Sequence, residues 1–159
     1  MNIAELQGVA LELLHRCHRL AREMQVDEHL AMDLDAEFGS LTRQHHVELY
    51  RSQRPARIDY RVGGTNPVLI ELAVRPEDGA SQLYGSQNKP ELVKLTRIPQ
   101  SRAKLRALLL MDLKPEPLQR NRLKQTYDCI SVGPGRFERN PVRVLYVHKE
   151  SQFHFLWRP

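Results

Sequence analysis

Two acidic residues, Asp59 and Glu71, are the first candidates for chemistry, because each lies in a short apolar segment beside a strong turn signal. Segments 56–62 and 68–74 are rich in β-branched and other apolar residues and are predicted to be strands. Between them, residues 63–67 read Gly-Gly-Thr-Asn-Pro, a composition that favours a turn. If this turn closes a tight antiparallel hairpin, Asp59 lies opposite Glu71.

The repulsion between two carboxylates in this arrangement must be offset by a positive charge. Directly opposed residues of an antiparallel pair have Cβ atoms roughly 4.5 to 5.5 Å apart, and like charges there repel each other. A divalent cation such as Mg²⁺ would compensate, because it prefers oxygen ligands and usually takes one or two carboxylates together with water and substrate phosphate. Alternatively, Arg57 and Arg61 flank Asp59 and neutralise the pair as a structural ion network. Both alternatives fit the spacing.

The segment before the hairpin favours helices. Apolar residues recur at spacings of three and four near the start of the chain, which predicts an amphipathic helix. These residues are Ile3, Leu6, Ala10, Leu13, Cys17, Leu20 and Met24. The stripe packs either on the body of its own domain or against a second copy of the chain in a homodimer. Another helix is predicted from Asp33 or Asp35 to about Gln53, with Glu37 and Glu48 on one face.

Two more helices are predicted after the hairpin. The first starts at Asn88, which we expect to act as the cap, with Pro90 in the first turn and Glu91 reaching back to the cap. Pro115 and Pro117 open the second, which runs to about Tyr127.

Strands are predicted between and after these helices. Segment 105–113 is apolar on both faces, as expected of a strand in the middle of a sheet that is covered on two sides. Segment 129–132 is predicted to be a short strand, so that strand, helix and strand form a parallel crossover. Segments 142–148 and 152–157 are predicted to form a closing hairpin.

Length and composition indicate one folded domain. The chain has 159 residues, of which 41% are hydrophobic and 27% are charged, values close to a globular average. We expect a single α/β domain with a helical extension at 1–32, a core at 35–132 and the closing hairpin at 133–159. The first residues lack the pattern of a signal peptide and no segment is apolar enough to span a membrane, so we expect a cytoplasmic protein.

The hairpin also resembles a known signature. The run Arg57-Ile58-Asp59-Tyr60, the glycine-rich turn and the run Val68-Leu69-Ile70-Glu71-Leu72-Ala73 resemble the signature hairpin of the PD-(D/E)XK nuclease superfamily. The predicted order of elements over residues 35–132 is similar to that family as well. The resemblance implies a restriction-endonuclease-like fold, in which a mixed β-sheet is flanked by helices. It also implies a hydrolase that cleaves DNA with Mg²⁺ or Mn²⁺ held by Asp59 and Glu71, with a further acid, Glu48 or Glu37, from the preceding helix.

One position departs from the family pattern. The family has a lysine two residues after the second acid, where this chain has Ala73. The resemblance makes Lys94 the best substitute, because the helix after the hairpin packs near the acids in this fold. Arg57 is a second candidate, since the expected register places it opposite Ala73. If no substitute serves, the site is degenerate and the chain is a non-catalytic module that binds nucleic acid or a protein partner.

The net positive charge of the chain favours an anionic binding partner. The chain carries 24 Lys and Arg residues against 19 Asp and Glu residues, for a formal net charge of +5. Basic residues attract phosphate through a field that salt screens. The candidates for contact with nucleic acid, most simply DNA, are Arg57, Arg75, Arg136 and Arg139, and one of the adjacent residues His45 and His46 could line the cleft.

Overall fold

The computed structural model describes the chain except for residues 17–22, 48–54, 79–82 and 133–139. Its centre is a single six-stranded mixed sheet whose strands follow the order of the sequence. The strands are β1 (Leu41–Val47), β2 (Ala56–Val62), β3 (Val68–Arg75), β4 (Leu105–Asp112), β5 (Val142–His148) and β6 (Ser151–Trp157). The helices are α1 (Ile3–Arg16), α2 (Glu23–Phe38), α3 (Lys89–Thr96) and α4 (Arg120–Asp128), with a short 3-10 helix, η1, at Gln100–Arg102. The predicted α/β class, with a mixed sheet flanked by helices, is therefore confirmed.

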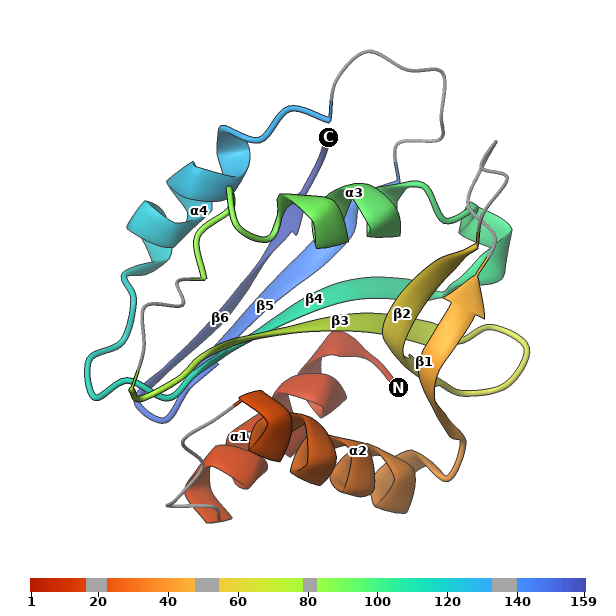
Figure 1. Ribbon diagram of the computed structural model, residues 1–159, viewed down its shortest axis with the longest axis horizontal. Helices are drawn as coiled ribbons and strands as arrows, with labels where there is room; N and C mark the ends of the chain where they lie inside the picture. Colours follow the sequence, from red (N-terminus) through yellow and green to blue (C-terminus); the bar gives the residue numbers. More distant parts are fainter. Residues whose placement is uncertain (17–22, 48–54, 79–82, 133–139) are drawn as a thin grey trace.

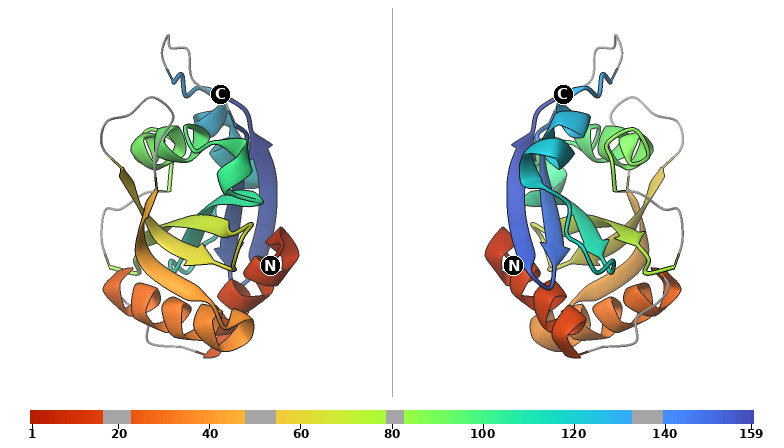
Figure 2. Two further views of the ribbon diagram at one scale, coloured as in Figure 1. Left: turned by 90° about the vertical axis from the view of Figure 1, so that its right-hand side faces the viewer. Right: turned by 90° about the vertical axis from the view of Figure 1, so that its left-hand side faces the viewer.

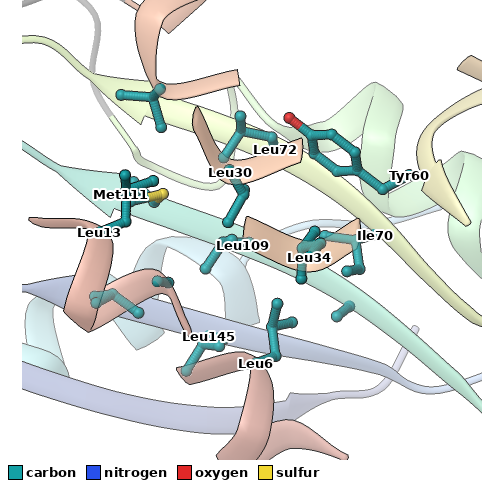
Figure 3. Close-up of a cluster of buried hydrophobic side chains, with 14 of the residues drawn as sticks. Leu6, Leu13, Leu30, Leu34, Tyr60, Ile70, Leu72, Leu109, Met111 and Leu145 are labelled. Atoms are coloured by element: carbon teal, nitrogen blue, oxygen red, sulfur yellow. The ribbon is translucent and has the colours of Figure 1, made fainter. Parts of the chain in front are cut away.

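Helices cover both faces of the sheet (Figure 1). The two views in Figure 2 show α1 and α2 across one face and α3 and α4 across the other. Each pair encloses its own apolar core, here called the α1–α2 core and the α3–α4 core. Figure 3 shows the α1–α2 core, where Leu13 and Leu30 from the helices pack near Leu109 of β4. Because β4 is covered on both faces, its residues from Arg106 to Asp112 are all buried, as expected from its apolar sequence.

The central hairpin forms where it was predicted. β2 and β3 are antiparallel, and Val62 pairs with Val68. The turn between them begins at Gly63, whose φ of 98° lies in the left-handed region that favours glycine. β3 then pairs with β4, and β4 with β5, in parallel, while β5 and β6 form the predicted antiparallel hairpin.

The helix predicted from Asp33 or Asp35 to about Gln53 is wrong. Both aspartates lie inside α2, which ends at Phe38, and Gly39 follows with a φ of 63°. Residues 41–47 form β1 instead and pair with the outer edge of β2. The spacing in this segment suited a helix, but the edge of β2 supplies backbone partners for an extended segment.

The described part of the amphipathic helix predicted at the start of the chain is α1, Ile3–Arg16. Leu6 and Leu13 are buried in the α1–α2 core, so this part of the stripe packs on its own domain. Met24 belongs to α2 and is 67% exposed, so it does not continue the stripe. Cys17 and Leu20 lie outside the described residues.

Three details after the hairpin differ from the sequence predictions. The strand predicted at 129–132 is wrong, and the parallel crossover from β4 passes through α4 to β5. α4 begins at Arg120, later than the two prolines suggested. Asn88 precedes α3 as expected but makes no capping bond, because its side chain is buried and donates to the Tyr127 hydroxyl at 3.1 Å. In the described part of the chain, no helix combines the length and apolar character that crossing a membrane requires.

Candidate functional site

β2 and β3 separate at Asp59. The described pairs between these strands run from Val62↔Val68 to Tyr60↔Ile70. Beyond them, Asp59 Oδ2 accepts a hydrogen bond from the backbone N–H of Leu72 at 2.9 Å. The carboxylate therefore occupies the place where a backbone partner would continue the ladder, which fixes it between the two strands.

A backbone irregularity in β1 accompanies this separation. Gln44 stands opposite Asp59 and has a φ of 51°, a left-handed conformation that is uncommon for a residue other than glycine. Its side-chain amide donates to Asp59 Oδ1 at 3.3 Å. On either side of the irregularity, Tyr60 packs in the α1–α2 core and Ile58 in the α3–α4 core, although they are only two residues apart. Ile58 and Tyr60 therefore lie on opposite faces of the sheet, whereas regular strand alternation would place them on the same face.

Glu71 is the buried member of the acid pair. It is 2% exposed and lies between Leu69 and Ala73, two residues that pack with the α3–α4 core. Burial raises the pKa of Glu71 to about 8, and the charge of the nearby Asp59 carboxylate adds to the shift. The two carboxyl groups are therefore close enough to influence each other, although the described pairs of β2 and β3 stop at Tyr60↔Ile70 and do not include Asp59 and Glu71.

Lys94 of α3 completes this group. Its Nζ lies 2.6 Å from Glu71 Oε1 and donates to the backbone carbonyl of Arg57 at 2.8 Å. Leu92 and Leu95, its neighbours on α3, are buried in the α3–α4 core and fix the helix against the sheet. The expectation that this helix brings a lysine to the acids is confirmed, while the chemical role of Lys94 stays a prediction.

The acid pair fits a divalent cation with oxygen ligands. Glu71 Oε1 contacts Lys94 as an ion pair, but it receives no hydrogen bond of ordinary geometry within the described part of the chain. A buried carboxylate with a second carboxylate beside it is costly when ionised, and a bound cation relieves that cost. The described residues offer no cluster of three or more His, Cys, Asp or Glu side chains, but Mg²⁺ usually needs only one or two carboxylates.

The two predicted third acids do not join the described site. Glu37 is exposed in the last turn of α2. Glu48 lies outside the described residues.

Sequence reasoning missed another acid beside Asp59. Asp27 of α2 lines a cavity of about 400 Å³ together with Asp59, Gln44, Met24 and Leu72. Its position on a separate helix left no signal in the hairpin pattern.

Asp27 is already engaged by its neighbours. Its carboxylate pairs with Arg43 of β1 and accepts a hydrogen bond from the hydroxyl of Tyr60. Burial and this contact with a carboxylate raise the pKa of Tyr60. Asp27 therefore joins α2 to β1 and β2, the second of which carries Asp59.

The predicted nucleic-acid contacts are scattered. Arg57 is exposed on β2, next to Lys94 through its backbone carbonyl. Arg75 lies at the far end of β3, where its guanidinium pairs with the buried Asp112 at 3.0 Å. Arg136 and Arg139 lie outside the described residues.

Comparisons with known proteins gave no match among models of protein families, curated proteins or solved structures. The side chains gathered where β2 and β3 separate are therefore the basis for a functional assignment.

Proposed function

We propose that this chain is a nuclease-like protein that hydrolyses DNA phosphodiester bonds with Mg²⁺ or Mn²⁺. Asp59 and Glu71 would hold the ion, and Lys94 would replace the lysine that the PD-(D/E)XK pattern has at position 73. The observation that supports the proposal is that one lysine and two carboxyl side chains approach one another from α3, β2 and β3. The net charge of +5 favours an anionic substrate.

The protein groups around the acids have separate tasks in this proposal. When bound, Mg²⁺ would polarise the scissile phosphate and lower the pKa of a water molecule. The Leu72 N–H and the Gln44 amide hold the Asp59 carboxylate in place. Lys94 reaches the acids from a helix that is anchored in the core, so its ammonium group is positioned to orient a phosphate oxygen or the attacking water.

Three observations favour a second candidate function, a non-catalytic module that binds nucleic acid. The Ala73 methyl group cannot donate to phosphate, and the ammonium group of Lys94 is already shared between Glu71 and the Arg57 carbonyl. A pKa of about 8 also keeps Glu71 largely protonated at neutral pH, which opposes cation binding.

Cleavage of DNA by the purified protein distinguishes the two candidates. Circular DNA and labelled duplex and single-stranded oligonucleotides would be incubated with Mg²⁺ or Mn²⁺. For an enzyme, Asp59→Asn should lower the rate by at least about 100-fold, because it removes a ligand charge. Asp128→Asn removes an exposed carboxylate on α4 and should leave the rate unchanged.

A second readout does not depend on cleavage. Mn²⁺ binding, followed by calorimetry or electron paramagnetic resonance, should be lost in Asp59→Asn and kept in Asp128→Asn. If the wild-type protein neither cuts any of these substrates nor binds Mn²⁺, the enzyme proposal is wrong. Salt-dependent DNA binding that is indifferent to Asp59→Asn would then support the non-catalytic module.

A further inference from the structure

β6 is a regular edge strand without the features that usually block further pairing. It is the last strand of the sheet on its side, and both views of Figure 2 show it at the margin of the molecule. It pairs with β5 along its whole length, from His148↔Ser151 to Val142↔Trp157, with no residue skipped. Its sequence, Ser-Gln-Phe-His-Phe-Leu-Trp, contains no proline and no Lys, Arg, Asp or Glu. An edge strand of this kind can pair with a strand of another chain unless charges, prolines or bulges prevent it.

The opposite edge of the sheet carries such protective features. β1 contains Gln44, whose left-handed φ of 51° interrupts the extended backbone. The neighbouring Arg43 is charged, and its side chain is 45% exposed. Irregular backbone and charged side chains both discourage the addition of a further strand. The molecule therefore protects the β1 edge of its sheet and leaves the β6 edge regular.

The free backbone groups of β6 belong to its even-numbered residues. Residues 149 and 150 form the loop between β5 and β6, so the closing pair, His148 and Ser151, exchanges hydrogen bonds. Since pairs alternate along an antiparallel ladder, the odd-numbered residues of β6 direct their N–H and C=O groups to β5. Gln152, His154 and Leu156 direct theirs to the edge. Within the described part of the chain, no backbone hydrogen bond reaches these outward groups.

A second copy of β6 can supply partners for all of these groups. In a twofold contact, residue i faces residue j of the second copy, and residue j faces residue i. If His154 faces itself across the axis, Gln152 of one copy faces Leu156 of the other, and outward groups meet outward groups. All 7 residues of the strand are then paired. Every other twofold register that keeps this alternation pairs fewer residues, so the axis at His154 gives the most hydrogen bonds.

This register also brings opposite charges together. Glu150 precedes β6 and Arg158 follows it, and each is four residues from His154. Glu150 of one copy therefore faces Arg158 of the other, and the symmetry produces this pair twice. Both residues are exposed, and none of the ion pairs among the described residues uses either of them. The charges at the two ends of β6 thus suit a second, antiparallel copy.

Aromatic residues line the other face of the contact. Phe153 of one copy faces Phe155 of the other, and opposed aromatic residues stabilise a strand pair. Phe153 stacks on Tyr146 with ring centroids 4.7 Å apart, and Phe155 meets Tyr127 edge-on at 5.6 Å. These contacts hold both rings in place before the copies meet, so association has few side chains to order. The aromatic row of the α3–α4 core then continues across the axis.

We infer that two copies of this chain associate through β6, antiparallel about a twofold axis at His154, so that their sheets form one continuous sheet. The outer edges of the dimer are then both β1, whose irregularity stops further addition, so the assembly closes at two copies. The inference goes beyond the proposed function and does not depend on it, because a chain without nuclease activity forms the same dimer.

The test measures the mass of the full chain in solution by sedimentation equilibrium over a range of concentrations. The wild-type protein should pass from one copy to two and not beyond. His154→Pro removes an outward N–H from each copy without removing a bond to β5, and edge strands tolerate proline at such positions. It should raise the dimer Kd by at least about 30-fold. His154→Ala keeps the N–H and should raise the Kd by less than about fivefold.

The register has its own test at low salt. Arg158→Glu and Glu150→Arg each place like charges together twice, and each should raise the dimer Kd by about three- to tenfold. The double variant Glu150→Arg/Arg158→Glu restores opposite charges and should return the Kd to within about twofold of the wild-type value. A double variant as weak as either single variant contradicts the axis at His154.

Hydrogen exchange of the wild-type protein tests the same contact without a variant. The amides of Gln152, His154 and Leu156 should be protected when the copies associate and should exchange as exposed amides on dilution to single copies. Those of Phe153 and Phe155 bond to β5 and should stay protected throughout. A chain that remains a single copy at about 1 mM overturns the inference. So does a dimer whose three outward amides exchange as fast as in the single copy, and so does an equal Kd for His154→Pro and His154→Ala.

Discussion

Replacing Glu71 by glutamine is expected to remove a large part of the pH dependence of stability. The pKa of this carboxyl group is about 8 in the folded chain, against an ordinary value of 4.5. Between these two pH values the folded state binds more protons than the unfolded state, so the free energy of unfolding of the wild-type protein falls as pH rises. The slope is about 1.4 kcal/mol per pH unit, which gives on the order of 4 kcal/mol from pH 5 to pH 8.

Urea denaturation of the wild-type protein and Glu71→Gln at unit steps from pH 5 to pH 9 measures this effect. The glutamine side chain cannot ionise, so the stability of the variant relative to the wild type should increase steadily up to about pH 8 and then level off. Glu37→Gln changes an exposed glutamate of α2 and controls for the loss of a carboxylate as such. Parallel stability curves for Glu71→Gln and the wild-type protein, within about 1 kcal/mol, would refute the reasoning, because they would mean that Glu71 ionises freely in the folded state.

Three other outcomes follow from the structure. Lys94→Met removes the cation beside Glu71. In urea denaturation, the resulting loss in the free energy of unfolding should be about 1 to 3 kcal/mol larger at pH 8 than at pH 6, because only the ionised carboxylate needs its partner. An equal loss at both pH values would contradict this prediction. Addition of Mn²⁺ at about 100 times its Kd should stabilise the wild-type protein by about 3 kcal/mol at pH 8 and should not stabilise Asp59→Asn, as measured by thermal unfolding. Gly39→Ala should lower the free energy of unfolding by about 1 to 2 kcal/mol in urea denaturation, because a φ of 63° is strained for alanine. Gly8→Ala, on the open surface of α1, should raise it by about 0.5 to 1 kcal/mol. A change of the same sign in both variants would contradict the left-handed conformation of Gly39.

The parts of the fold that sequence reasoning predicted depend on neighbouring residues. The glycine-rich turn and its two apolar flanks were enough to predict β2, β3 and their register near the turn. The run 105–113 is apolar on both faces and was correctly predicted to be a central strand. Segment 41–47 was not, because β1 is a largely polar edge strand whose residues also fit one face of a helix. Only its pairing with β2 decides its conformation.

The candidate site also combines features that the local sequence predicted with features that only the tertiary structure decided. The sequence by itself determined the register of β2 and β3 next to the turn, which brings Asp59 and Glu71 near each other, because turn geometry and strand alternation are short-range properties of the chain. The tertiary structure alone decided three things about this pair: that the strands separate at Asp59, that Glu71 is buried, and that Lys94 supplies its positive charge. These depend on how α3 packs on the sheet and on which backbone groups find partners, and such contacts join segments that no local pattern connects.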